Sequence, residues 1–195
     1  MAAAYFAHSI EAKVRSRDRL GLVYGHLGRT ELALMAGRMA DADDDLDVAF
    51  DLIGDQSDPR LTAWARTLSA HALSSRGDAE RALVAAKAAV DFTRHRGQRR
   101  RLALALEATA VALAAGEQWP TAVATLQSAR TLWAALAIVR PAFSQRVEAS
   151  VDDLARGGLS EPAFRAALDV GSARGDELVE EAARLVARLA LDGHT

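Results

Sequence analysis

The acidic stretch at residues 41–47 is the first group of side chains that could do chemistry. It is rich in aspartate, with the order Asp-Ala-Asp-Asp-Asp-Leu-Asp. Carboxylates one helical turn apart, such as Asp43 and Asp47, offer the hard oxygen ligands that Mg²⁺ prefers. An all-helical metal-dependent enzyme, or a small-molecule-binding protein using residues 43–47, is therefore one interpretation. Because a run of like charges repels itself and no second metal motif accompanies it, we favour a solvated acidic turn.

A basic cluster is the second candidate. Arginine side chains fork onto phosphate and carboxylate groups, so such a cluster could contact an anion. The alternative is a solvated loop in which arginines satisfy the carbonyl end of the preceding helix, and we favour this alternative. The cluster comprises Arg94, Arg96, Arg99, Arg100 and Arg101, with His95 among them.

Signals for catalysis are weak in the rest of the chain. It has no cysteine and no glycine-rich phosphate loop. The histidines also lack the i, i+4 spacing of a helical metal pair; they are His8, His26, His71, His95 and His194. We therefore predict no enzyme activity, no catalytic residue, no cofactor and no metal.

Composition and periodicity predict an all-α fold. Half of the 195 residues are hydrophobic, and alanine and leucine, which favour helices, dominate. Residues 61–76 and 79–96 predict one helix pair, and residues 99–115 and 119–136 a second. Gly77 and Gly116 mark the two turns, and their separation falls in the range typical of helical repeats.

The regions on either side complete one domain spanning residues 1–195. Residues 1–58 predict a degenerate first repeat, in which Gly28 breaks a helix and Thr30 caps the next. Whether residues 1–27 form one helix or two stays open, and the aspartates either end the following helix or bend it. Residues 59–138 hold the two pairs. Residues 139–195 predict C-terminal capping helices, the last with Leu178, Ala182, Leu185 and Leu189 on one face.

Charge and hydropathy limit the partners. The net charge is −2, so no overall field attracts nucleic acid or an anionic membrane. No long uncharged apolar run could span a bilayer, and no secretory signal is recognised at the start. We expect a cytoplasmic protein that contacts neither membrane nor nucleic acid directly. Its partner would be a protein or peptide, or a small-molecule effector, and a homo-oligomer is compatible with the sequence.

Two stretches resemble known helical modules. The segment Leu20-Gly21-Leu22-Val23-Tyr24, followed by Gly28, Ala33 and Ala40, resembles the tetratricopeptide repeat. Gly77 with Ala82 and Ala89, and Gly116 with Ala122 and Ala129, look similar. Residues 119–185 are similar to the C-terminal region of bacterial LuxR-type and related ATPase-coupled transcriptional regulators. The resemblance implies stacked antiparallel helix pairs and a sensor or scaffold function.

That resemblance also implies a binding surface. In such arrays the first helix of each pair lines a concave groove. Aligning Gly28 with Gly77 places two groups of residues there: Arg15, Asp18 and His26 from the first unit, and Trp64, Thr67, His71 and Ser74 from the second. Trp64 either lines this groove or packs in the core against Leu20 and Tyr24. We therefore expect a non-enzymatic protein- or ligand-binding module.

Overall fold

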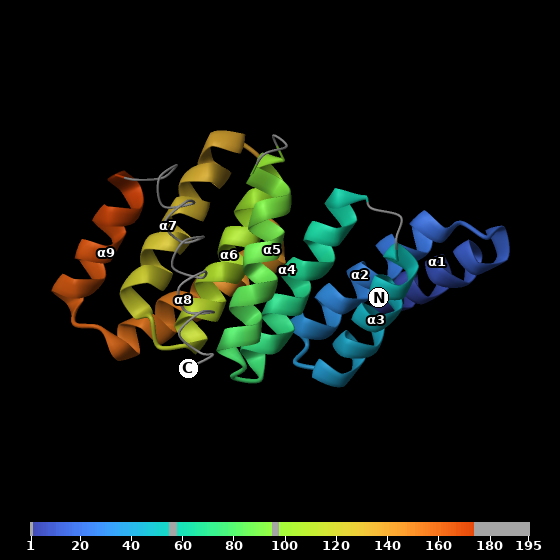
Figure 1. Cartoon of the computed structure of the whole chain (residues 1–195), viewed down its shortest axis with the longest axis horizontal. Helices are drawn as coiled ribbons and strands as arrows, with labels where there is room; N and C mark the ends of the chain where they lie inside the picture. Colours follow the sequence, from blue (N-terminus) through green and yellow to red (C-terminus); the bar gives the residue numbers. More distant parts are fainter. Residues whose placement is uncertain (1, 55–57, 95–97, 174–195) are drawn as a thin grey trace.

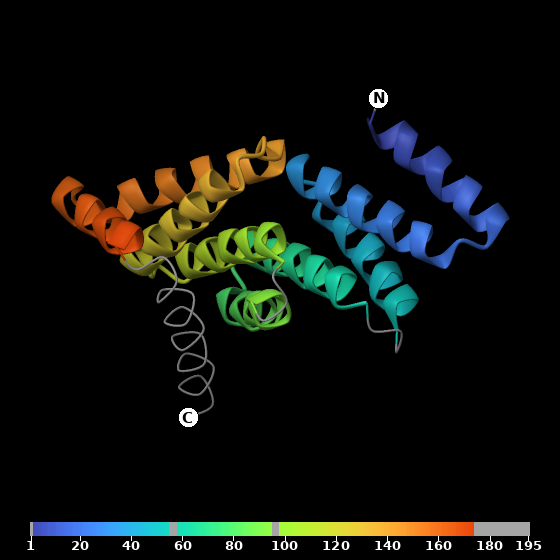
Figure 2. The ribbon, with the colours of Figure 1, turned by 90° about the horizontal axis from the view of Figure 1, so that it is seen from above.

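The computed structural model describes residues 2–54, 58–94 and 98–173, and within them the chain is helical throughout its regular structure, with no strand. Helices α1 to α7 follow one another along the long axis, α8 lies alongside α6 and α7, and α9 is at the opposite end from α1 (Figures 1 and 2). They are α1 (Ala2–Ser16), α2 (Arg19–Met35), α3 (Met39–Ile53), α4 (Pro59–Ser75), α5 (Ala79–Arg94), α6 (Arg99–Ala115), α7 (Trp119–Leu136), α8 (Ala142–Gly158) and α9 (Glu161–Ala173). The predicted last helix lies outside the described residues.

The helices from α2 to α7 begin at evenly spaced positions, a pattern that we call the repeat register. The turns inside the pairs α2/α3, α4/α5 and α6/α7 fix it. Each turn places one residue in the left-handed region, at the same step along the chain: Gly37 (φ 71°), Gly77 (φ 76°) and Glu117 (φ 59°). The structure thus contains both of the predicted helix pairs. Gly116, however, has φ −92° and is not the left-handed residue of its turn. The helices of the register start at Arg19, Met39, Pro59, Ala79, Arg99 and Trp119.

The prediction that Gly28 breaks a helix is wrong. Gly28 lies buried in the middle of α2. A Cβ atom there would overlap the Phe6 ring, and one on Gly25 would lie 2.6 Å from Ile10. These glycines let α1 pack closely on α2. Thr30 is likewise inside the helix and not a cap, since its hydroxyl donates to the His26 carbonyl at 3.0 Å.

The open question about residues 1–27 is settled as two helices. Arg17 adopts φ 54° between α1 and α2. Asp18 then caps α2 by accepting a hydrogen bond from the Gly21 amide at 2.8 Å. The Lys13 ammonium lies 2.7 Å from the same carboxylate and fixes it in place. The hydrogen bonds from Lys13 and from Gly21 lower the pKa of Asp18.

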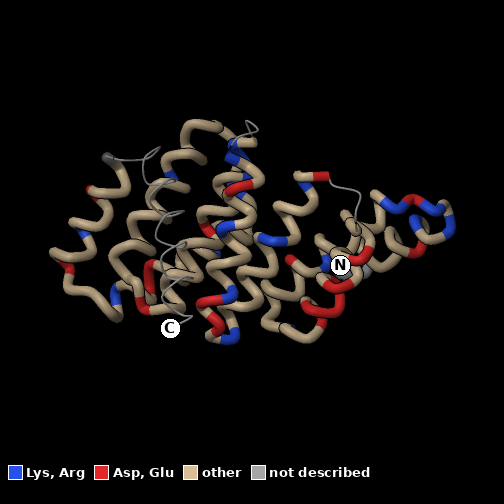
Figure 3. Tube along the Cα trace, in the orientation of Figure 1, with Lys and Arg blue, Asp and Glu red and all other residues tan. Residues whose placement is uncertain are grey.

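The predicted acidic turn is wrong, and the aspartates neither end nor bend the helix, because α3 runs through them without interruption. Neutralising partners explain this: Asp41 pairs with Arg38, Asp43 with Arg76, and Asp45 with His26 and Arg29. Asp45 is buried, with the His26 Nδ1 at 2.8 Å and the Arg29 Nε at 3.0 Å. Part of the acidic cluster therefore links α3 to α2 through ion pairs. The cluster appears as acidic segments on α3 in Figure 3.

Small side chains set the distance between paired helices. Ala42, Ala82 and Ala122 occupy equivalent positions in the repeat register, and each is fully buried. Neighbouring helices pack throughout the series, and the first helices of the pairs also contact one another, α2 with α4 and α4 with α6. Each pair therefore rests on the next along a line of first helices.

Helix α8 is held to α6 and α7 by buried polar groups. The Glu107 carboxylate of α6 is fully buried and accepts a hydrogen bond from the Trp133 indole at 2.7 Å, with the Arg140 guanidinium at 3.5 Å. Burial raises the pKa of Glu107, although the hydrogen bond from Trp133 opposes the shift. The start of α8 also reaches α2, where the Arg146 guanidinium donates to the Met35 carbonyl at 2.7 Å.

Candidate functional site

Aromatic and basic side chains from α2, α4 and α6 meet on one surface, which we call the first-helix face. It comprises Tyr24, Glu31, Arg60, Trp64, Arg100 and Arg101. The rings of Tyr24 and Trp64 lie 5.9 Å apart, and the Arg101 guanidinium lies 4.7 Å from the centre of the Trp64 ring. Such stacking holds a cation in a defined position. Residues far apart in the sequence are thereby brought into one row.

Arg101 is the residue that gives this surface its electrostatic character. It is half-buried, and burial lowers the pKa of its guanidinium. Within the described residues it forms no ion pair and no hydrogen bond with a carboxylate. Glu31 is close enough to interact, but burial raises the pKa of Glu31, against the attraction of Arg101 and Arg100. A desolvated guanidinium of this kind favours an anionic ligand.

The start of α6 adds to the positive charge. Arg99, Arg100 and Arg101 fill its first turn, where the helix dipole disfavours cations. Its N-cap, Gln98, makes no side-chain capping bond, and the Gln98 Oε1 is buried with no hydrogen-bond partner among the described residues. By contrast, aspartates cap α2 and α4. The three arginines in the first turn of α6 are thus locally unfavourable, which is expected where a surface serves binding.

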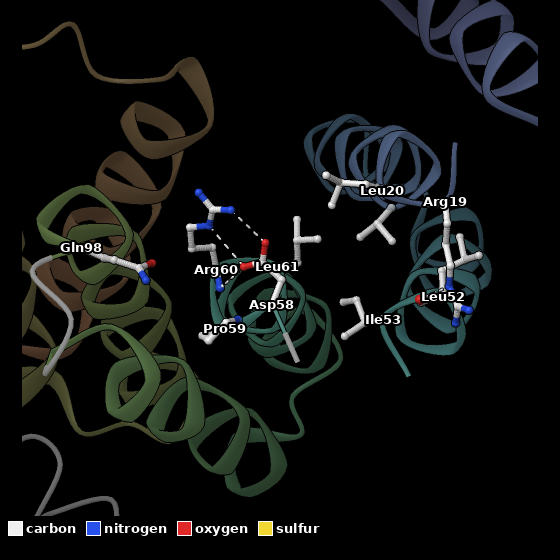
Figure 4. A pocket seen from close by; sticks show the side chains of 10 residues that line it. Arg19, Leu20, Leu52, Ile53, Asp58, Pro59, Arg60, Leu61 and Gln98 are labelled. Carbon is white, nitrogen blue, oxygen red and sulfur yellow. Dashed lines mark hydrogen bonds and ion pairs between the residues drawn. The ribbon is translucent and has the colours of Figure 1, made fainter. Parts of the chain in front are cut away.

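A cavity of about 660 Å³, the Arg60 cavity, adjoins the first-helix face. Arg60 belongs to both, because it lies near enough to Arg101 for its charge to contribute to lowering the pKa of Arg101. Figure 4 shows Asp58 and Arg60 side by side at the start of α4, with dashed lines joining the Arg60 guanidinium to the Asp58 carboxylate. The cavity is lined by Arg19, Leu20, Val23, Leu52, Ile53, Asp58, Pro59, Arg60, Leu61 and Gln98.

Asp58 and Arg60 neutralise each other inside this cavity. The Arg60 Nη2 lies 3.0 Å from the Asp58 Oδ2, and the Arg60 amide donates to the Asp58 Oδ1 at 2.9 Å. The hydrogen bond from the Arg60 side chain lowers the pKa of Asp58. The positive charge that the first-helix face can offer to a ligand therefore lies on Arg100 and Arg101.

The residues predicted for the groove do not stay together. Trp64 lies on the first-helix face, half-buried, with its ring against both Tyr24 and the core around Leu61 and Leu68. Thr67 and Ser74 are buried, and their hydroxyls donate to carbonyls of their own helix, Ala63 and Ala70, at 2.8 Å. These two residues are therefore not available to a ligand.

The first unit of the predicted groove was misplaced because it was aligned on Gly28. Arg15 belongs to α1, which is not the first helix of a described pair. Asp18 is the cap of α2, and His26 is engaged by Asp45 of α3. His71 is buried and lies on the same helix as Trp64, farther along, where its ring packs edge-on against Phe143 at 4.8 Å.

The basic cluster divides between two helices. Arg94 ends α5, whereas Arg99, Arg100 and Arg101 begin α6, and Arg96 and His95 lie outside the described residues. Basic residues gather at this junction in Figure 3. Of the described arginines in the cluster, Arg100 and Arg101 approach Glu31 of α2. Trp64 of the predicted groove and Arg100 and Arg101 of the predicted anion contact thus share one surface, which was not expected.

The acidic cluster does not converge on a point. Its partners on α2, α4 and the start of α3 draw Asp45, Asp43 and Asp41 in different directions. Among the described residues, no three His, Asp or Glu side chains form a group that could hold a metal ion.

Comparison with known proteins adds no assignment. No protein-family model, no curated protein and no solved structure matches the chain. In the part of the chain that the structure describes, none of the helices is long and apolar enough to cross a membrane. The first-helix face therefore has to be interpreted from its own geometry.

Tyr24, Glu31 and Arg60 were not predicted as site residues. The repeat register could have indicated Tyr24 and Arg60, because in it Tyr24 is equivalent to Trp64, and Leu20 is equivalent to Arg60 and Arg100. Starting from Gly37 rather than Gly28 would have revealed it.

Proposed function

We propose that the chain is a non-enzymatic binding module whose first-helix face takes an extended acidic segment of a partner protein. The observation that carries the proposal is Arg101, a half-buried cation stacked on Trp64 with no carboxylate bound to it among the described residues. A ligand carboxylate there would complete a charge-assisted hydrogen bond. Arg100 supplies a second cation beside it.

The surface also suits the apolar part of a peptide. Leu20 and Tyr24 are exposed large hydrophobic residues on α2, next to the half-buried Trp64. Trp, Tyr and Arg are the residues most often found at the energetic centre of protein interfaces. The Arg60 cavity extends the surface toward α3, which gives room for a neighbouring side chain. Apolar side chains alternating with carboxylates would satisfy both parts.

The pairing of the helices supports a tetratricopeptide-like stack as the scaffold. The even spacing of helix starts and the contacts among α2, α4 and α6 are the basis for this part of the proposal. Such stacks bind along the line of first helices. The further proposal, that the chain is or derives from a bacterial transcriptional regulator, rests on the sequence resemblance alone.

Matched peptides test the proposed function. Fluorescein-labelled peptides in which Phe alternates with Glu, Gln or Lys would be titrated with the protein and followed by fluorescence anisotropy. We expect binding of the Glu peptide only, weakening with added NaCl because the contact is ionic. Equal binding of the Glu and Gln peptides, or no binding of either, would contradict the proposal. A single-stranded oligonucleotide bound more tightly than the Glu peptide would assign the face to nucleic acid instead.

A further inference from the structure

A second cavity, the His71 cavity, lies at the other end of the first helices. Its volume is about 180 Å³, and it is formed by α2, α4, α6 and α8 together. Its lining residues are Leu34, Met35, His71, Ser75, Val111, Phe143, Arg146, Val147 and Ser150. None of them belongs to the first-helix face, so the two sites are distinct.

The floor of this cavity is apolar apart from one ring. Phe143 and Val147 of α8 are buried there, and Val111 of α6 forms a wall. His71 is only 5% exposed, and within the described residues its imidazole makes no hydrogen bond. Burial lowers the pKa of His71 to about 4, so the ring is neutral at pH 7. His71 lines the cavity and its ring nitrogens make no hydrogen bond with the described residues, so a ligand in the cavity could bond to one of them.

The rim has the opposite character. Ser75, Arg146 and Ser150 are exposed and form the polar edge of the cavity. Arg146 is the one charged residue among the described residues that line it, and its Nη1 is fixed by the Met35 carbonyl at 2.7 Å. A guanidinium held in this way keeps its other N–H groups for a carboxylate.

We propose that the His71 cavity binds a small organic carboxylate with a single apolar ring, its ring on the Phe143 floor and its carboxylate at Arg146. The size is appropriate, since an apolar protein cavity of about 150 Å³ is known to hold benzene. A hydroxyl on the ring could bond to the neutral His71 imidazole.

Such a ligand would bridge distant parts of the chain. The cavity joins α2 to α8, and the direct contact between Arg146 and Met35 links these helices across a long stretch of sequence. A molecule bound to both walls would stabilise the docking of α8 on α2. The cavity therefore gives the module a place for an effector separate from its peptide partner.

The test uses benzoate, 4-hydroxybenzoate and uncharged benzyl alcohol as probes on the full chain. The NMR signal of the His71 Cε1–H, assigned with the His71→Gln variant, reports occupancy, and thermal melting reports stabilisation. We expect benzoate to shift this signal in a saturable way and to raise Tm. Benzyl alcohol should bind about tenfold more weakly or worse, because it lacks the charge-assisted bond.

Two variants sharpen the test. Arg146→Gln should remove the preference for benzoate over benzyl alcohol. Arg66→Gln, which deletes an exposed arginine of α4 that lies over Phe50, should keep that preference. No shift of the His71 signal at saturating benzoate, or equal binding of benzoate and benzyl alcohol by the unaltered protein, would overturn the proposal. Retention of the preference in Arg146→Gln would also overturn it.

Discussion

The structure and the sequence pattern assign different residues to the left-handed position of the turn between α6 and α7, and a substitution can distinguish the two assignments. The pattern marks Gly116 as the turn residue, whereas the backbone places Glu117 at φ 59° and Gly116 at φ −92°. Replacing Glu117 by Gly should therefore stabilise the protein. The Glu117 side chain is exposed and makes no hydrogen bond or ion pair within the described residues, so nothing is lost with it.

The magnitude follows from the backbone. A left-handed conformation costs a non-glycine residue about 1–2 kcal/mol. Glycine gives back about 0.4–1 kcal/mol of this gain, because it increases the entropy of the unfolded chain. Glu117→Gly should therefore raise the free energy of unfolding by roughly 0.5–1 kcal/mol.

Two glycine-to-alanine variants serve as controls, one at a left-handed turn residue and one at the residue next to Glu117. Gly77 has φ 76° and open space around it, so Gly77→Ala should lower the free energy of unfolding by about 0.5–1 kcal/mol through the backbone alone. At Gly116 a Cβ atom would meet Ala79 at 3.4 Å, an ordinary contact. Gly116→Ala should thus be neutral or stabilising by up to about 1 kcal/mol.

The assay is urea unfolding followed by circular dichroism, with midpoints compared at equal slope. Repeat stacks can depart from two-state behaviour, so a second probe, tryptophan fluorescence, should give the same transition. A destabilised Glu117→Gly, or a Gly116→Ala variant that loses as much stability as Gly77→Ala, would refute the register.

Three further predictions concern packing and charge. In Gly28→Ala the new Cβ atom would overlap the Phe6 ring, so α1 should detach, seen as faster proteolysis within Ala2–Ser16 than in the unaltered protein; an unchanged digestion pattern would contradict this. Ala82→Leu should cost about 1–3 kcal/mol by overpacking the fully buried contact between paired helices, measured by urea unfolding; an unchanged midpoint would contradict the pairing. Burial raises the pKa of Glu107 in the folded protein above its pKa in the unfolded chain, which is near 4.5. The stability that protonated Glu107 contributes is therefore fully present below pH 4.5 and is lost as the pH rises through the folded-state pKa. Glu107→Gln should therefore gain stability relative to the unaltered protein as the pH rises from 4.5 to 7, and melting curves that stay parallel across this range would exclude that linkage.

Much of the helical pattern could be predicted from the sequence. The helix pairs α4/α5 and α6/α7 were predicted within a few residues of their ends, because the turn at Gly77 and the apolar periodicity agree locally. The boundary between α1 and α2 was left open because it depends on the ion pair of Lys13 with the Asp18 cap, which cannot be predicted from the residue types alone.

The first repeat was misread for a physical reason. Glycine serves both turns and close helix contacts, and the sequence does not say which. Gly28 makes room for Phe6 of α1, and Gly37 makes the turn. Likewise, the aspartates of α3 are expected to repel one another from the sequence alone, but in the fold His26 of α2 pairs with Asp45, and Arg76 at the end of α4 pairs with Asp43. The misreading of Gly28 moved the predicted groove.

The candidate site could be predicted only in part. Trp64, Arg100 and Arg101 were named from residue type, but as members of two unrelated sites. Their meeting depends on the repeat register, which sets α6 beside α4. That Arg101 makes no ion pair with a carboxylate within the described residues, although Glu31 lies near it, is a three-dimensional property and has no sequence signal.

One comparison of affinities tests the central claim most directly. Arg101→Gln and Arg66→Gln each remove one positive charge and one contact with an aromatic ring, at Trp64 and at Phe50 respectively. With both variants folded by circular dichroism, the Kd for the alternating Glu/Phe peptide would be measured by anisotropy. The first-helix face predicts a loss of about tenfold or more for Arg101→Gln and a change within about twofold for Arg66→Gln. Equal losses in the two variants would show a general charge effect and would contradict a binding site at Arg101.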